Sequence, residues 1–340
     1  MNRFPLRTIA SGLSLLAVIL DFGVAAFLLH SALYDRNWLT QTRNALFSDF
    51  VSDRSFFTAS PEQMLAAGFS ADSPQAIDEW RQLLLGEVEY AGTWLATRGS
   101  TIDRAQALVL LFSRNGAIVD GTHRCGEFEF RDLIDVLQRI GTDQGYGCCS
   151  DHSQAFLALS SIAGIHAREL AHSQHVFSEF YSPELGQWIW VDPQFALMAR
   201  TPGGDYLSLV EVRDLYQNGE EIDLVFFGNH HHVLDGRAPR THPYYDQALD
   251  FADYRVTWGN NVFEQEEFRQ RFEMIPISAR QLLGLFSNSL PEYMMLVDEN
   301  SHLPKAFRSR RRLCLGVFAA LLLTNSVLAL WLRERIHLAR

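Results

Sequence analysis

Residues 147–164 read Gly-Cys-Cys-Ser-Asp-His-Ser-Gln-Ala-Phe-Leu-Ala-Leu-Ser-Ser-Ile-Ala-Gly, and this stretch decides the fold. Its apolar side chains Phe156, Leu159 and Ile162 recur at helical spacing, which predicts a helix. Gly164 is a natural stop just beyond the end of that helix. The preceding residues 141–147, Gly-Thr-Asp-Gln-Gly-Tyr-Gly, are too rich in glycine for regular structure. Cys149 is therefore predicted at a junction where a loop enters a helix.

The predicted position of Cys149 suits a reactive thiol. The amino end of a helix carries the positive end of the helix dipole, which favours the thiolate form of a cysteine. Asp151 fits the first turn of the same helix, where negative charge is favoured. The alternative interpretation is a small buried residue at a helix start, because free cysteines are often simply buried.

A predicted β-hairpin lies just downstream. Residues 175–181 and 187–191 are β-prone, and the residues between them, Ser-Pro-Glu-Leu-Gly, are typical of a turn. With a loop of about four residues, Tyr181 pairs with Gly186 and His175 falls opposite Asp192. Opposed β-carbons are about 4.5–5.5 Å apart, close enough for a carboxylate to bind and orient an imidazole. The alternative is a structural hairpin with a polar end and two core tryptophans.

These segments resemble the transglutaminase-like superfamily, which is related to papain-like cysteine proteases. The family motifs are Gly-x-Cys-x-Asp-x-(Ala/Ser), Gly-Ile-x-Ala-Arg, His-Val-aromatic-x-Glu and Trp-x-x-Asp-Pro. The resemblance covers about residues 141–193, in the same order. The matching residues are Gly147, Cys149, Asp151 and Ser153; Gly164, Ile165, Ala167 and Arg168; His175, Val176, Phe177 and Glu179; and Trp188, Trp190, Asp192 and Pro193.

The resemblance implies an α+β fold with a transglutaminase-like core, in which the cysteine helix packs on an antiparallel sheet. It implies that Cys149 is the nucleophile, His175 the general base and acid, and Asp192 the orienting carboxylate. Two departures stand out. Phe177 occupies a position where the family often has tryptophan, which should alter packing and leave the chemistry alone. Cys148 adjoins the nucleophile, so the choice of Cys149 depends on its spacing from the next motif residues.

Acyl transfer through a thiol needs an oxyanion hole. The backbone N–H of Cys149 would supply one donor, and the side chain of Gln144 is the candidate for a second. Gln144 could equally be a solvated loop residue. Trp188 and Trp190 are candidates for the walls of an acyl slot, although a tryptophan in a hairpin is more often a core residue.

Two apolar runs near the chain ends predict a membrane protein. Residues 9–29 and 313–332 are each long enough to cross a bilayer as a helix. The first run could alternatively be a signal peptide, because Arg3 and Arg7 precede it. Asp21 is costly in a span, and we expect it to pair with Asn325 or Ser326 across the two helices.

The basic residues beside the two spans bear on the orientation of the protein in the membrane, and they point in different directions. Arg3 and Arg7 favour an inner amino terminus, and the arginines after residue 332 favour an inner carboxyl terminus. Basic residues at 305–312 point the other way. We expect both termini inside, with the large middle domain in a bacterial-type periplasm.

Composition excludes several function classes. The chain has 340 residues and a net charge of −11, and both ends are basic, so the middle is more acidic still. Such a domain is a poor candidate for binding nucleic acid or anionic lipid. The four cysteines do not form a disulfide scaffold: Cys125 could pair with Cys148, or Cys148 could regulate Cys149 by reversible oxidation. The triplet 230–232, His-His-His, lacks further ligands, so we expect no metal and no cofactor.

The expected organisation has five parts. Residues 1–30 form a transmembrane anchor, 31–98 a mostly helical juxtamembrane segment, 99–200 the catalytic core, 201–304 a carboxyl-terminal extension, and 305–340 a basic stretch with a second transmembrane helix. Helices are expected over 78–85, 87–96, 101–115, 130–140 and 206–217. Residues 258–261, Trp-Gly-Asn-Asn, are typical of a turn and could border a substrate groove.

The sequence supports two hypotheses from different classes. The first is a membrane-anchored cysteine enzyme that transfers acyl groups from peptide or protein amides, as a peptidase, amidase or transglutaminase. The second is a catalytically idle binding or assembly module of a cell-envelope or surface-polysaccharide machine, because a fold can outlive its activity. All three triad positions are filled, which favours the enzyme.

Overall fold

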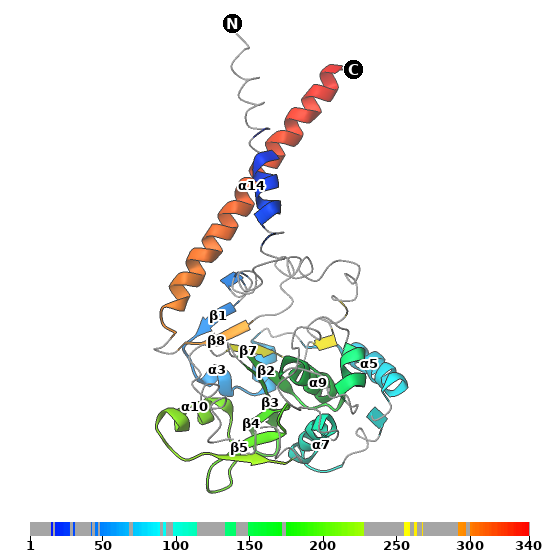
Figure 1. The fold of residues 1–340 in the computed structure, drawn as a ribbon, viewed down its shortest axis with the longest axis vertical. Coiled ribbons are helices and arrows are strands. Elements are labelled where there is room, and N and C mark those ends of the chain that lie inside the picture. Colours follow the sequence, from blue (N-terminus) through cyan, green and yellow to red (C-terminus); the bar gives the residue numbers. More distant parts are fainter. Residues whose placement is uncertain are drawn as a thin grey trace. The chain divides into compact units, whose positions relative to one another are not determined.

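The computed structural model of the chain describes residues 15, 18–27, 30, 42, 45–46, 48–67, 71–88, 91–92, 98–113, 133–140, 149–171, 175–227, 255–258, 262–263, 267, 292–296 and 300–339. The chain divides into two compact units (Figure 1). One comprises residues 49–273 and 289–301, and the other comprises residues 1–48, 274–288 and 302–340.

The described strands form one sheet in the order β1-β8-β7-β2-β3-β4-β5-β6. The neighbouring strands from β8 to β6 all pair in antiparallel orientation. The strands are β1 (Ser48–Val51), β2 (Ala167–Ala171), β3 (Val176–Ser182), β4 (Gln187–Asp192), β5 (Leu197–Arg200), β6 (Asp223–Phe226), β7 (Arg255–Trp258) and β8 (Glu292–Met295).

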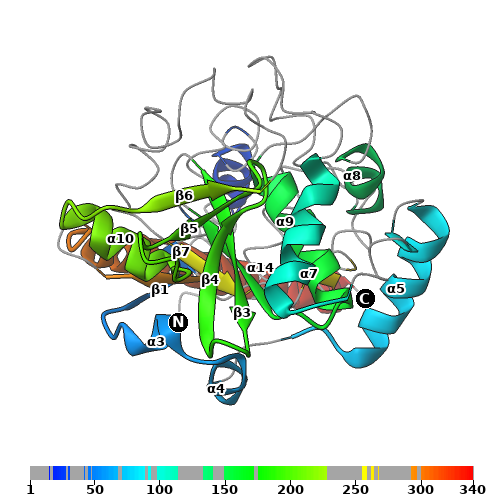
Figure 2. The same cartoon turned by 90° about the horizontal axis from the view of Figure 1, so that it is seen from below.

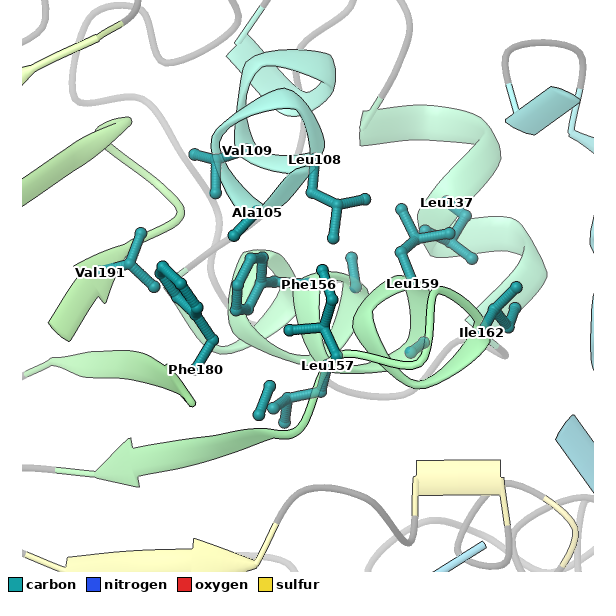
Figure 3. Close-up of a cluster of buried hydrophobic side chains, with 14 of the residues drawn as sticks. Ala105, Leu108, Val109, Leu137, Phe156, Leu157, Leu159, Ile162, Phe180 and Val191 are labelled. Atoms are coloured by element: carbon teal, nitrogen blue, oxygen red, sulfur yellow. The ribbon is translucent and has the colours of Figure 1, made fainter. Parts of the chain in front are cut away.

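One face of the sheet is covered by the helix that carries the cysteine, α9 (Cys149–Ile162). Phe156 packs edge-to-face on Phe180 of β3, with ring centroids 6.4 Å apart (Figure 3). Three more helices complete this layer, and Figure 2 shows them grouped around α9: α5 (Pro74–Glu87), α7 (Thr101–Ser113) and α8 (Leu133–Ile140). The expected α+β fold, with a cysteine helix packed on an antiparallel sheet, is therefore confirmed.

Helix α9 ends where the sequence predicts, and its described part starts at Cys149. Gly164 follows its end with φ at +68°, a left-handed conformation that glycine adopts without strain. All its residues from Asp151 to Ile162 are buried except Gln154. The helix is therefore a central element, which explains why its sequence is apolar on more than one face.

The opposite face of the sheet carries a second core. Phe177, Trp190 and Leu197 point to this face and pack with residues of α10 (Leu209–Gln217) and with Phe57 of α3 (Ser55–Thr58). A short helix, α4 (Pro61–Ala66), follows α3 and has a capping box at Ser60. With cores on both faces, β3 and β4 lie in the centre of the domain.

The register of the β3–β4 hairpin differs from the prediction by two residues. Tyr181 pairs with Trp188, and Ser182 with Gln187. Gly186 has φ at +68° and its N–H donates to the Ser182 carbonyl, so this glycine belongs to the turn and cannot pair in the strand. The predicted pairs Tyr181 with Gly186 and His175 with Asp192 were therefore wrong, although a shift of two residues leaves every side chain on its predicted face.

The expected helices are present where the structure describes them. Those predicted over 78–85, 101–115, 130–140 and 206–217 correspond to α5, α7, α8 and α10. The helix predicted over 87–96 lies mostly outside the described residues. The segment 31–98 also contributes a strand, β1, to the sheet. Trp258 ends β7 and pairs with Arg168 of β2, and the other residues of the predicted turn, 259–261, lie outside the described residues.

The second unit contains one long apolar helix, α14 (Leu303–Ala339), of which Leu303–Arg333 is long and apolar enough to cross a membrane (Figure 1). The predicted carboxyl-terminal span is confirmed as such a helix. The amino-terminal apolar helix is short, Val18–Phe27, and the rest of 9–29 lies mostly outside the described residues. Among the residues that the structure describes there is thus one membrane-length helix, and two were predicted. Asn325 donates to Asp21 at 2.9 Å, as expected.

Candidate active site

The structure brings His175 and Asp192 into direct contact. His175 precedes β3 and Asp192 ends β4, and Nε2 of the imidazole lies 2.8 Å from Oδ2 of the carboxylate. Both residues are buried, with 1 % and 0 % of their surface exposed. The observed register makes them diagonal neighbours, a separation of about 7–8 Å between backbones that two side chains can bridge.

The second oxygen of the Asp192 carboxylate is also held by hydrogen bonds. Oδ1 of Asp192 accepts hydrogen bonds from the backbone N–H groups of Gln194 (3.0 Å) and Phe195 (3.3 Å). This is an Asx turn, in which an aspartate side chain closes the turn that follows its own strand. The predicted orienting carboxylate is therefore held in one rotamer, with one oxygen aimed at the imidazole.

Aromatic rings pack around the imidazole. The ring of Phe177 meets it edge-on at a centroid distance of 4.3 Å, and Phe195 lies at 6.0 Å. These contacts exclude water from the imidazole–carboxylate pair and limit rotation of the His175 ring. Phe177 is the position where the resembling family often has tryptophan, and its role in this structure is packing.

Cys149 is the third member of the group. It is a free cysteine at the first position of α9, and its side chain is in hydrogen-bonding contact with His175. Because Nε2 of the imidazole faces Asp192, the remaining ring nitrogen, Nδ1, is the one available to the thiol. Cys149 is only partly buried, whereas its two partners are buried.

The environment changes the pKa of His175. Burial is the largest influence and by itself lowers the pKa, because the charged imidazolium is poorly solvated. The negative charge of Asp192, its hydrogen bond and the contact with Cys149 act in the other direction, and together they raise the pKa from 6.5 to about 9. At neutral pH the ring is therefore an imidazolium, in contact with the side chain of Cys149.

A pair of buried hydroxyl groups joins the cysteine helix to the histidine strand. Oγ of Ser153 lies 2.7 Å from Oγ of Ser178 and donates to the Phe177 carbonyl at 3.1 Å. Both serines are 0 % exposed. Ser153 is one turn after Cys149, and Ser178 is three residues after His175. These contacts therefore fix how far the thiol sits from the imidazole, a link that the sequence analysis missed.

A buried ion pair supports the sheet behind the site. Arg168 of β2 and Glu179 of β3 are register partners, and each is 1 % exposed. The guanidinium also donates to the Phe57 carbonyl and lies 4.0 Å from the centroid of Trp188, and Glu179 accepts from the Leu209 N–H. Both residues were matched to family motifs, but their contact could not be read without the order of the strands.

The remaining predicted site residues do not join the group. Gln144 lies outside the described residues, as do Cys125, Cys148 and the triplet 230–232. Trp188 and Trp190 are 1 % and 0 % exposed. Trp188 donates to the Ala59 carbonyl, and Trp190 packs on Phe177. Both indoles have core contacts here, so their part in an acyl slot stays a prediction.

No cluster of three or more histidine, cysteine, aspartate or glutamate side chains that could hold a metal ion occurs in the part of the chain that the structure describes. Comparison of the chain with protein families, with curated proteins and with solved structures found no match. The chemistry of this site therefore has to be argued from its own residues.

Proposed function

We propose that this protein is a membrane-anchored cysteine enzyme of the transglutaminase-like type, which transfers acyl groups from amide bonds of peptides or proteins. The observation that carries the proposal is the buried His175–Asp192 contact, with the side chain of the partly buried Cys149 hydrogen-bonded to the same imidazole. A purely structural hairpin has no need for a charged histidine at its end.

The proposed reaction begins with the thiolate of Cys149. Its sulfur attacks the amide carbonyl carbon to form a carbon–sulfur bond, and the negative charge moves to the carbonyl oxygen. The backbone N–H of Cys149, at the start of α9, is the first donor to that oxygen. The carbon–nitrogen bond then breaks, and the imidazolium of His175 gives its proton to the leaving amine.

The second half of the reaction restores the enzyme. Neutral His175 accepts a proton from water, or from an amine, as that nucleophile attacks the thioester, and the sulfur leaves as thiolate. Asp192 remains negative throughout, holding the ring and stabilising its charged form. Water gives hydrolysis and an amine gives a new amide, so peptidase and transglutaminase activity differ only in the second nucleophile.

The proposed place of the reaction is the cell membrane, with α14 as a span and the amino-terminal helix as a second anchor beside it. The Asn325–Asp21 hydrogen bond supports this pairing, because a carboxylate in a span requires a polar partner. The catalytic domain would lie on the periplasmic side. Its partners would be an amide-bearing peptide or protein and the envelope complexes in which such substrates occur.

The test is site-resolved labelling with a thiol-directed electrophile, read by mass spectrometry on the full-length protein. Cys149 should react much faster than Cys125 or Cys314, and His175→Ala should slow it strongly. Cys148→Ala is the matched control and should leave the rate unchanged. Slow labelling of Cys149 that is indifferent to His175 would sink the proposal. Envelope peptides, with Cys149→Ala as the inactive control, then define the substrate.

A further inference from the structure

The beginning of α14 carries basic side chains on one face. Lys305, Arg308 and Arg312 are exposed and lie three and four residues apart. At 3.6 residues per turn, this spacing places them within an arc of about 60° and over about 10 Å of helix. We call these three residues the basic stripe. Among the described residues, none makes a hydrogen bond or an ion pair with the side chains of the stripe.

The basic stripe lies at a position where cations do not stabilise the helix. Its first member lies in the first turn of α14, which contains no acidic residue. Cations at the amino end of a helix oppose the helix dipole, so they lower its stability. No acidic residue occurs anywhere from 301 to 312 to offset them. The position of the stripe therefore has no explanation in the local stability of α14.

The rotation of α14 is fixed by a neighbouring arginine. Arg311 donates to the carbonyls of Ala45 at 3.0 Å and Ser48 at 3.1 Å, all within the same unit. Around the helix, Arg311 is about 60° from Arg308, 100° from Arg312 and 120° from Lys305, all in the same direction. The stripe therefore lies on the flank next to the Arg311 contact, and its three side chains remain exposed.

The apolar part of α14 begins directly after the stripe. Leu313, Leu315 and Phe318 are exposed, at 66 %, 58 % and 44 %. A helix that changes from exposed cations to exposed apolar side chains between Arg312 and Leu313 matches the boundary of a bilayer, where phosphate groups give way to acyl chains.

We propose that the basic stripe binds the headgroups of anionic phospholipids in the leaflet where α14 enters the membrane. The three side chains present positive charge at headgroup depth, and the phosphate and glycerol groups of such lipids supply the missing partners. The proposal rests on the proposed membrane span, and it is independent of the chemistry of Cys149.

The test uses the full-length protein reconstituted in phosphatidylcholine vesicles, with spin-labelled phosphatidylglycerol or phosphatidylcholine as the probe. Electron paramagnetic resonance measures how strongly each lipid is retained at the protein surface. We expect phosphatidylglycerol to be favoured by roughly threefold or more, because each cation near the surface attracts anionic lipid. The triple variant Lys305→Gln, Arg308→Gln, Arg312→Gln should lose most of that preference.

A matched pair of single variants distinguishes binding by one face of the helix from a general effect of positive charge. Arg308→Gln should weaken the preference, whereas Arg310→Gln, about 200° around the helix, should change it little. Equal effects of the two variants would overturn the proposal, as would a triple variant that keeps its preference. Inorganic phosphate should compete no better than chloride of equal ionic strength; stronger competition would show a site for free phosphate instead.

The result of the lipid experiment can be distinguished from the result of the test of the proposed enzyme activity. Labelling of Cys149 in the same vesicles reports the thiol site, and Cys149→Ala should keep the lipid preference. A protein that does not insert into the vesicles would overturn both the span and the stripe while leaving the thiol chemistry intact.

Discussion

Replacing Asp192 by asparagine should remove the charge that keeps His175 protonated. One carboxylate oxygen accepts from two backbone N–H groups and the other faces Nε2 of the imidazole. In Asp192→Asn the amide oxygen keeps the backbone contacts, and the NH2 group turns to Nε2. That nitrogen must then accept, so the ring becomes neutral and carries its proton on Nδ1, facing Cys149. A neutral ring protonated there cannot take a proton from the thiol.

The magnitude follows from the pKa of His175. The pKa is raised to about 9 in the native protein, and burial alone would lower it below 6.5. At pH 7.5 the protonated fraction of the ring should therefore fall from about 97 % to under about 10 %. The cation beside the sulfur is then lost from most molecules, so alkylation of Cys149 at pH 7.5 should slow by roughly tenfold, in step with the loss of the imidazolium.

The assay is the rate of Cys149 alkylation by iodoacetamide across pH 5 to 10, in a Cys148→Ala background so that the two sulfurs cannot be confused. Around neutral pH the native protein should react roughly tenfold faster than the Asp192→Asn protein, and the difference should shrink above about pH 9, where native His175 loses its proton. Asp205→Asn, an exposed aspartate, is the matched control. An unchanged pH profile in a folded Asp192→Asn protein would refute the role given to this carboxylate.

Three further predictions concern stability and positioning. Raising the pH from 6.5 to above 9 should lower the free energy of unfolding by on the order of 3 kcal/mol, because folded His175 holds a proton that the unfolded chain has released; urea unfolding that stays flat over this window would contradict the raised pKa. Ser153→Ala and Ser178→Ala should each cost about 1–3 kcal/mol, and the double variant less than their sum. Each serine variant should also slow the alkylation of Cys149, and strict additivity in stability would show that the hydroxyls do not act as a pair. Arg168→Met should cost about 3–5 kcal/mol by leaving Glu179 as an unpaired buried charge, and adding Glu179→Gln should recover part of the loss in a thermal melt.

The sequence predicts the elements of the site better than the sheet that holds them. Helix α9 and the hairpin are visible because local signals are strong there: helical spacing after Cys149, a stop at Gly164 and turn residues between two β-prone runs. Whether a helix or a hairpin forms depends mainly on residues that are close together in the chain. Short-range sequence patterns are therefore sufficient to predict these two elements.

Local sequence patterns do not show which strands pair when the strands are far apart in the chain. Strand β7 pairs with β2 although Trp258 and Arg168 are 90 residues apart in the numbering, and each strand has only four or five residues. Predicting the contact of Arg168 with Glu179 also requires the order of the strands, because the two residues meet only when β2 lies beside β3. No periodicity within either segment carries that information.

The prediction that His175 reaches Asp192 survived a wrong register for a physical reason. Side chains alternate between the two faces of a strand, so an error of one residue would have put the imidazole and the carboxylate on opposite faces, and an error of two keeps them on the same face. The diagonal distance exceeds the directly opposed one by only a few ångströms, which the side chains cover to meet at 2.8 Å. For a site built across a hairpin, the parity of the register therefore decides whether the chemistry is possible. The local turn, in which Gly186 takes the left-handed conformation, decides only how the partners reach each other.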